Sequence, residues 1–506
     1  MYHWYSHSQF LSFVRKKLVR HYGSCERIEE LHHHGPMIAK ILPVDLSKVR
    51  DILKDQYSSS RKGKRGWDPV SMFRSLLVMT LEREPSITQW VKRMRGEPLL
   101  AILSGFRPDR VPGVGTFYDF TKRLYPQSDG CFIKRNKLRE FKTKPKKKVK
   151  QGEKMPPKHP GIVEKLVSRV ISGKGMLVSN HSEKIFNRIL KDCFVEVSLA
   201  KGILGNSRDL STSGDSTMIK SGGSPYGTKI CKCKEKGIYR CTCPRRYSDV
   251  EARWGWDSYR EDWVWGRSLY ELIDPDSYYS LPIFLKMAQA QRHDSVLGVA
   301  TLHEVRRLYQ DCCFSEFSAD SAHDAYPIYR LLDHWDIGAI IALNPKNEGH
   351  FTYDPPLRIT KDGIPICKGE YEMVSGGYCR DRFRIKWQCP QVRGKVTDCK
   401  YFSCSDSNYG RVIYTKSEWD LRVFTRVPRG SKLWKKRYAR HSASERSNKR
   451  KKIDYGLLRA RVRSNRQWFT RCALAAMCQH LDAWYKEAKL DPSSFVDSWI
   501  EESMAA

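Results

Sequence analysis

The stretch CFSEFSADSAHDAYPIYRLLDHWDIGAIIALN (313–344) decides the expected fold of the central part of the chain. CFSEFSAD (313–320) predicts a strand that ends in an acid, AYPIYRLLDHW (325–335) a helix, and GAIIALN (338–344) a second strand. Strands that alternate with helices are typical of an α/β sheet with helices on its faces. We therefore expect an α/β core in which Asp320 stands at the carboxyl end of a strand.

The segments around this stretch extend the core. WVWGRSLYEL (263–272) and LPIFLKMAQA (281–290) predict adjacent strands, and Asp294 or Ser295 is expected to cap the helix that follows. A helical stretch from about 161 to 198 precedes them. Residues 345–437 interrupt the alternation of strands and helices with short β-like segments, five cysteines and frequent Gly and Pro. A long basic helical pattern resumes at Tyr438. The sequence thus predicts a core of residues 161–344 plus 438–490, interrupted by a β-rich insertion over 345–437.

The first 142 residues predict a helical domain. Asp68-Pro69 is a helix start, Ser86 caps the next helix, and Thr116 opens another, each followed by apolar residues at helical spacing. Lys and Arg on the outer faces favour a DNA-binding bundle, with a plain helical bundle as the alternative. TKPKKKVKQGEKMPPKHP (143–160) predicts a basic, disordered linker, because its like charges repel and its four prolines block regular structure.

The charge of the chain points to a polyanionic partner. Its 506 residues include 91 Lys and Arg against 56 Asp and Glu, a formal net charge of +35. Such an excess repels itself in the folded state and is typical of nucleic-acid binding. No run of about 18 apolar residues exists, so we expect no membrane span, and the N-terminus lacks the order of a signal peptide. The 16 cysteines are then expected in a reducing cytoplasm, as metal ligands or buried thiols.

Three acids are candidates for a two-metal site. Cutting a phosphodiester calls for two divalent ions held by clustered carboxylates, so converging acids imply Mg²⁺ or Mn²⁺. Asp320 is the strongest candidate because open α/β sheets place ligand groups at carboxyl strand ends, with Asp324 as its rival. Asp215 precedes a Gly-rich turn, and Asp209 is its alternative. Glu445 begins a basic helix.

The surroundings of Glu445 suit a phosphate strand. Lys449 and Lys452 stand at i+4 and i+7 on the same helical face as the glutamate. A solvated basic face is the alternative interpretation. The residues expected to contact nucleic acid here are Arg440, Arg446, Lys449 and Lys452.

Two sets of cysteines predict structural zinc. Cys231-Lys-Cys233 and Cys241-Thr-Cys243 form a CxC…CxC arrangement whose four thiolates can reach one tetrahedral Zn²⁺. The alternative is four exposed thiols in a basic loop. A second zinc would stabilise the insertion, which has few apolar residues, through Cys367, Cys389, Cys399 and Cys404.

With these features in place, the chain resembles the DDE transposases of bacterial insertion sequences, in the group that carries a β-strand insertion before the helix bearing the glutamate. The resemblance covers most of the chain. It rests on WDPVSMFRSLLVMTLEREPSITQWVKRM (67–94), VPGVGTFYDFTKRL (111–124), GDST (214–217), RWGWDS (253–258), RHDSV (292–296) and, most specifically, SERSNKRKKIDYGL (444–457). The related pattern Tyr-x2-Arg-x3-Glu-x6-Lys is only partly present, since Arg440 is displaced and His441 stands in its place.

The resemblance implies an RNase H-like catalytic core preceded by an all-α DNA-binding domain. It places Asp215 on the first core strand, Asp320 after the fourth, and Glu445 on the helix after the insertion. The implied activity is DNA cleavage and strand transfer at terminal inverted repeats and target DNA, by a homodimer in a prokaryotic cytoplasm at the nucleoid. The alternatives are a catalytically inactive, transposase-derived DNA-binding protein and another nuclease of RNase H fold.

Overall fold

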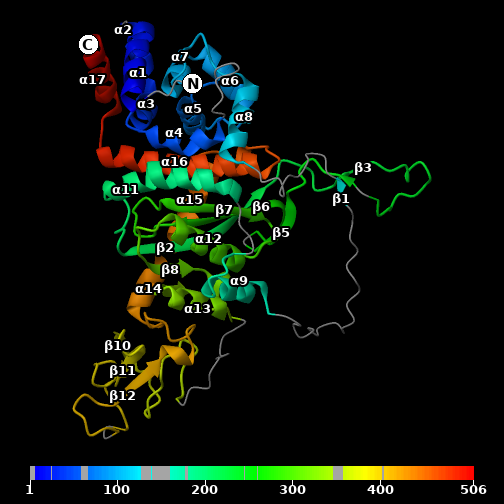
Figure 1. The fold of residues 1–506 in the computed structure, drawn as a ribbon. Coiled ribbons are helices and arrows are strands. Elements are labelled where there is room, and N and C mark those ends of the chain that lie inside the picture. The colour runs from blue at the N-terminus through cyan, green and yellow to red at the C-terminus, as the bar shows by residue number, and fades with distance from the viewer. Residues whose placement is uncertain are drawn as a thin grey trace.

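A computed structural model of the protein describes residues 6–23, 25–57, 66–126, 138–139, 160–176, 181–243, 245–258, 260–345, 357–401 and 404–505. A helical layer lies at one end, an α/β layer in the middle, and the insertion at the far end (Figure 1). The predicted linker 143–160 falls outside the described residues, except for Pro160. No helix among the described residues is both long and apolar enough to span a bilayer.

The amino-terminal layer is built from short helices. Asp68 caps α5 and accepts hydrogen bonds from the backbone N–H groups of Val70 and Ser71, and Ser86 caps α6, as the sequence predicts. The expected start at Thr116 is two residues late, because α8 begins at Val114 after Gly113. The helices are α1 (His7–Tyr22), α2 (Cys25–His33), α3 (Gly35–Ile41), α4 (Ser47–Leu53), α5 (Pro69–Leu81), α6 (Ile87–Gly96), α7 (Pro98–Ser104) and α8 (Val114–Leu124).

The central sheet has the strand order β7-β6-β2-β8-β9, and β5 pairs with the first half of β6. Strand β6 is antiparallel to β2 and β7, whereas β8 and β9 run parallel to β2. The predicted strands near 263–272, 281–290, 313–320 and 338–344 are confirmed. The observed bounds are β2 (Leu210–Lys220), β5 (Arg253–Asp257), β6 (Asp262–Ile273), β7 (Pro282–Gln289), β8 (Phe314–Ala319) and β9 (Gly338–Ile341).

Helices cover both faces of this sheet. Helix α12 (Asp294–Leu308) connects β7 to β8, and helix α13 (Tyr326–His334) connects β8 to β9. Helix α9 (Ile162–Ile171) packs on both of them. The cap of α12 is His293, one residue before the expected Asp294. The opposite face is covered by α15 (Ser442–Ile453) and α16 (Asn465–Ala488), with α10 (Lys184–Leu190) beside β7. A π-helical turn over residues 191–195 links α10 to α11 (Glu196–Ala200). One continuous hydrophobic core joins the helical layer to the sheet through α16.

The two faces of the sheet are set by the alternation of side chains along β2. Gly214 lies on the α12 side, where an added Cβ would stand only 2.2 Å from Tyr270 Oη, so only glycine fits there. Ser213 lies on the other side, where its Oγ is 2.8 Å from Ser444 Oγ of α15. Odd-numbered residues of β2, including Asp215, therefore face α15.

The free edge of β7 is covered by side chains, among them Asn187 of α10 and Glu183, which accepts from the N–H of Met287 at 3.0 Å. The amide of Asn187 in α10 donates to the carbonyl of Leu285 at 2.9 Å and accepts from its N–H at 3.0 Å. An unpaired strand edge is a site of unwanted pairing. The helical segment before β2 thus completes the sheet instead of leaving it open.

The carboxy-terminal helical pattern is not one helix. It is divided into α14 (Lys432–Ala439), α15 and α16, and it continues past the expected boundary into α17 (Pro492–Ala505), which packs on α1 and α3. The break between α15 and α16 contains Gly456, whose φ of +66° is left-handed. The helical pattern predicted from Tyr438 is therefore confirmed, but periodicity alone did not show where it is broken, because it does not register single left-handed residues.

The insertion is a small β-unit with its own core. Strands β10 (Val374–Cys379), β11 (Arg384–Gln388) and β12 (Val412–Lys416) form an antiparallel sheet over a cluster that includes Trp387 and Phe424. Arg429 ties it to the main sheet, because its guanidinium donates to the carbonyl of Ile341 at 2.6 Å and to Tyr329 Oη at 2.9 Å.

A buried histidine joins α16 to the sheet and to α11. His480 Nε2 donates to the carbonyl of Pro282 at 2.9 Å, so Nδ1 is the acceptor for Ser198 Oγ at 2.8 Å. Trp484 Nε1 donates to the same Oγ at 2.7 Å. The ring is neutral in this network, and burial lowers the pKa of His480 to about 4.

We expect acid to destabilise the protein partly through His480. The unfolded histidine takes up a proton near pH 6.5 and the folded one only near pH 4, so stability is lost as pH falls through this window. The loss would reach about 3 kcal/mol at pH 4. Urea unfolding at pH 7.5 and 4.5 should therefore show a smaller pH difference for His480→Gln than for wild type. An equal pH difference would show that His480 does not carry this effect.

Candidate active site and cysteine cluster

Two of the predicted acids stand side by side at adjacent strands. Gly214 of β2 is paired in parallel register with Ala319 of β8. Asp215 on β2 and Asp320, directly after β8, are the next residues in the chain, and neighbouring strands lie only about 4.8 Å apart. The register therefore brings together two carboxylates that are 105 positions apart in sequence.

Asp215 is in an environment that opposes its negative charge. Burial, the charge of Asp320 and the charge of Asp294 raise the pKa of Asp215 to about 7. Asn448 Nδ2 of α15 donates to its carboxylate at 3.3 Å. A carboxyl group with so high a pKa gains a full charge at neutral pH only when a cation compensates it.

Asp320 is held by a hydrogen-bonded histidine. Burial would raise its pKa, but the hydrogen bond and charge of His323 outweigh burial and lower the pKa below its ordinary value. His323 Nδ1 donates to Asp320 Oδ1 at 2.8 Å, and its Nε2 is 2.9 Å from Tyr270 Oη. The two neighbouring aspartates thus differ, with Asp320 ionised more readily than Asp215.

Glu445 lies on α15 beside the two aspartates. On this helix, Ser444 contacts Ser213, His441 Nδ1 is 2.8 Å from the same serine, and Asn448 reaches Asp215. Glu445 is one turn after His441 and is exposed. The pKa of Tyr438 is raised by burial and by the charges of Asp320 and Glu445, which places Tyr438 near both acids.

The three carboxylates do not form a compact cluster. Among the described residues, Asp215, Asp320 and Glu445 do not bring one oxygen each within 4.8 Å of one another. Two buried oxygens near Asp215, Glu271 Oε1 and Asn448 Oδ1, have no hydrogen-bond donor in the described chain. This oxygen-only set of donors is the type that Mg²⁺ and Mn²⁺ prefer.

The alternatives to these aspartates lie elsewhere. Asp209 is exposed and precedes β2, six residues and about 20 Å from Asp215 along an extended strand. Asp324 is buried and accepts hydrogen bonds from Tyr329 Oη at 3.0 Å and from the N–H of Asn344 at 2.8 Å. It also forms an ion pair with Arg422 of the insertion at 3.4 Å. Asp324 therefore connects the insertion to the core.

Two further acids near Asp215 did not emerge from the sequence. Asp294 accepts a hydrogen bond from Ser216 Oγ at 2.6 Å, and Glu271 is the register partner of Asp215 on β6. Asp294 was expected only as a helix cap, although its motif RHDSV belongs to the resemblance. Glu271 could have been noticed in the sequence, because it is an acid within the largely apolar predicted strand WVWGRSLYEL.

The four basic residues expected at the site are in different situations. Arg440 forms ion pairs with Asp276 and, at 3.2 Å, with Glu316. Arg446 and Lys449 are exposed. Burial and then the charge of Arg260 lower the pKa of Lys452, while Asp257 and Asp215 act in the opposite direction. Lys452 is therefore the cation of this set that faces the acids.

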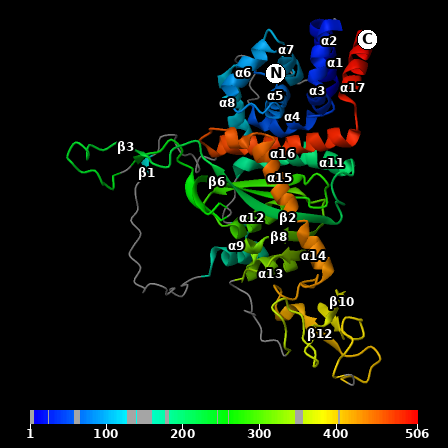
Figure 2. The same cartoon turned by 180° about the vertical axis from the view of Figure 1, so that it is seen from behind.

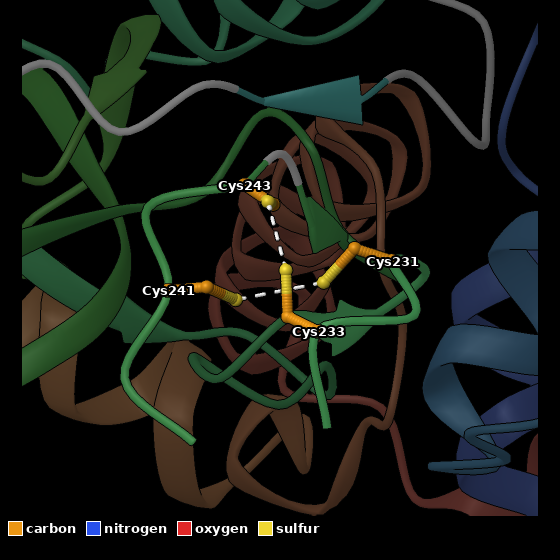
Figure 3. Close-up of side chains that lie close together, drawn as sticks. All are labelled: Cys231, Cys233, Cys241 and Cys243. Carbon is orange, nitrogen blue, oxygen red and sulfur yellow. Dashed lines mark hydrogen bonds between the residues drawn. The ribbon is translucent and has the colours of Figure 1, made fainter. Parts of the chain in front are cut away.

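The cysteines of the CxC…CxC arrangement converge. Cys231 Sγ is 3.5 Å from Cys241 Sγ, and Cys233 Sγ is 3.5 Å from Cys243 Sγ (Figure 3). All four sulfur atoms lie within 4.8 Å of one another. This arrangement is compatible with one zinc ion.

The cysteines of the insertion are not gathered in this way. Within the described part of the chain, Cys367, Cys389, Cys399 and Cys404 do not form a group with the same spacing. Cys389 is buried and the other three are half-buried. A second zinc stays a prediction from the sequence alone.

Comparison with known proteins gives one family match. Residues 26–123, which span most of α2 through α8, match the family model described as "Transposase domain (DUF772)". No curated protein matches the chain. A cryo-EM structure of the piggyBac transposase synaptic complex with hairpin DNA matches with a TM-score of 0.35 and 8% identity, covering 92% of this chain and 80% of that chain. A TM-score this low does not establish a shared fold, whereas the family match supports a transposase function.

Proposed function

We propose that the protein is a DDE transposase with an RNase H-like catalytic core. The strand order β7-β6-β2-β8-β9, with three antiparallel and then two parallel strands, supports this core. The insertion between β9 and α15 supports the bacterial insertion-sequence group named by the resemblance. The observation that carries the proposal is the register of β2 with β8, which juxtaposes Asp215 and Asp320 on the face crossed by α15.

Asp215, Asp320 and Glu445 are the proposed ligands of two Mg²⁺ or Mn²⁺ ions. Such ions would activate the attacking oxygen and compensate the charge on the leaving oxygen. His323 keeps the Asp320 carboxylate ionised and oriented. Asn448 orients Asp215, and α15 fixes Glu445 on the same face. These contacts would hold the carboxylates that we propose as oxygen ligands of the two ions.

DNA is the proposed substrate. The helices of the matched segment would bind the terminal repeats, and Arg446, Lys449 and Lys452 would contact the strand at the acids. Arg440 is less available because two acids already neutralise it. Two copies of the chain would bring two ends together.

We expect end cleavage to depend on a divalent metal. Full-length protein incubated with a duplex that carries the element's ends should cut it with Mg²⁺ or Mn²⁺. EDTA should abolish cutting, because it removes the ions that would activate the attacking oxygen and compensate the leaving oxygen. A gel that resolves nicked strands and joined products measures this. Binding without cleavage would favour the inactive DNA-binding protein, and cleavage without end preference or joining would favour another nuclease.

A further inference from the structure

A second feature of the molecule lies outside the catalytic sheet. Residues 228–243 form a long connection between β2 and β5, which we call the cysteine arm. It begins with β3 (Thr228–Lys229), which pairs with β4 (Arg245–Arg246), and β4 pairs in turn with β1 (Leu138–Arg139). The arm projects away from the body in both views (Figures 1 and 2). The arm is therefore positioned to contact another molecule.

The cysteine arm has no hydrophobic core. None of its residues is buried, and Tyr239 and Ile238 are 67% and 50% exposed. A segment of this size without a core does not hold one conformation through packing. Small units of this kind are commonly stabilised by a disulfide or a metal ion.

The distances between the sulfur atoms fit a bound metal ion and do not fit a disulfide. A disulfide requires about 2.05 Å between sulfur atoms, well below the 3.5 Å separations in the arm. Four sulfur atoms at about 2.3 Å from a tetrahedral zinc lie about 3.8 Å apart, close to what is observed. The backbone turns tightly beside these ligands, because the N–H of Ile238 donates to the carbonyl of Cys233 at 2.8 Å and Gly237 has a φ of +72°.

The surface of the arm is basic. Between 228 and 243 there are five Lys and Arg against one acid, Glu235. Lys232, Lys234 and Lys236 surround the turn, are exposed, and have no acidic partner within 4 Å among the described residues. Cationic side chains without internal partners are free to meet an external polyanion.

We propose that the cysteine arm is a zinc-stabilised element that binds the phosphate backbone of duplex DNA away from the cleavage site. The zinc ion fixes the turn, and Lys232, Lys234 and Lys236 make the contacts. This inference rests on the proposed function for its choice of DNA as the polyanion. Its zinc and its DNA contacts are tested separately.

The zinc test uses metal analysis of the full-length protein purified without chelators. Elemental analysis should give one zinc per chain less for Cys231→Ser/Cys241→Ser than for wild type, and the wild-type content for the control Cys313→Ser, whose cysteine lies outside the arm. Because serine variants could also misfold, thermal unfolding accompanies the measurement. A zinc content that is the same in the double variant as in wild type, or no zinc in wild type, overturns the zinc site of the arm.

The DNA test uses Lys232→Gln/Lys234→Gln/Lys236→Gln and a control with the same charge change in the insertion, Lys368→Gln/Lys395→Gln/Lys400→Gln. Affinity for an end duplex is measured from 50 to 200 mM salt. The arm variant should bind about tenfold or more weakly, with a salt slope shallower by about 1 to 3, since each lost phosphate contact removes about 0.9. The control should keep the slope of wild type.

The outcomes distinguish the two proposals. If wild-type protein binds no end duplex, the proposed function fails. If it binds and cuts, but the arm variant has the affinity and slope of wild type, the arm does not contact DNA and the proposed function stands. Equal losses in both triple variants would attribute the effect to net charge and overturn the arm contact.

Discussion

Replacing Asp215 or Asp320 by asparagine is expected to slow DNA end cleavage by about 10³-fold or more. Asparagine keeps the shape of the side chain but removes the negative charge that holds a divalent ion. Loss of a ligand that supports transition-state charge is worth several kcal/mol, and each 1.36 kcal/mol is a factor of ten in rate. Single-turnover cleavage of a labelled end duplex in Mg²⁺ measures the effect, while a gel shift checks that DNA binding persists.

The matched control is Asp209→Asn, which makes the same chemical change at an exposed position before β2. It should cut within about twofold of wild type. If Asp209→Asn were inactive and Asp215→Asn active, the assignment on β2 would be wrong. Glu445→Gln should lose activity like the aspartate variants, because its carboxylate is the proposed third ligand.

The same variants separate catalysis from folding. Burial and two neighbouring acids raise the pKa of Asp215 to about 7, so its charge is unfavourable in metal-free protein. Asp215→Asn should therefore unfold at a temperature equal to or above that of wild type in EDTA. A variant that loses activity and gains stability cannot owe its defect to misfolding.

The sequence predicted individual elements better than the pairings between them. Asp320 could be placed because a strand that ends in an acid before a helix is a local pattern, and β8 ends at Ala319 as expected. The choice of Asp215 over Asp209 depended on the resemblance. In the structure the distinction comes from the register of β2 with β8, which no local pattern encodes.

The sequence did not reveal three further residues of the site for the same physical reason. Glu271 and Asp294 become neighbours of Asp215 only after β6 and α12 pack against β2. His323 is three positions after Asp320, yet its role depends on Tyr270 across the sheet. The convergence of the four cysteines of the arm was predictable, because they are close in sequence, whereas the cysteines of the insertion are scattered along the chain.

A buried ion pair beneath the site supports the second large prediction. Lys451 of α15 donates to the Glu271 carboxylate and, at 2.7 Å, to Ser447 Oγ. Both charged side chains are at most 1% exposed. Burial lowers the pKa of Lys451, while the charge and hydrogen bond of Glu271 oppose that change. This pair fixes α15, and with it Glu445, against the strand that lies beside Asp215.

Lys451→Met is expected to destabilise the protein by about 3–5 kcal/mol, because it leaves the buried Glu271 carboxylate without a counter-charge. Glu271→Gln/Lys451→Met removes both charges and should recover most of the loss, since a neutral pair no longer pays for desolvation. Urea unfolding of wild type, both single variants and the double variant gives the coupling energy.

If Lys451→Met were within 1 kcal/mol of wild type, Glu271 would have to be neutral in the native protein, and α15 would be held by packing alone. If the double variant recovers stability and also cuts DNA, the ion pair serves only to position the helix; if it recovers stability without cutting, the charge of Glu271 itself contributes to the acidic site around Asp215.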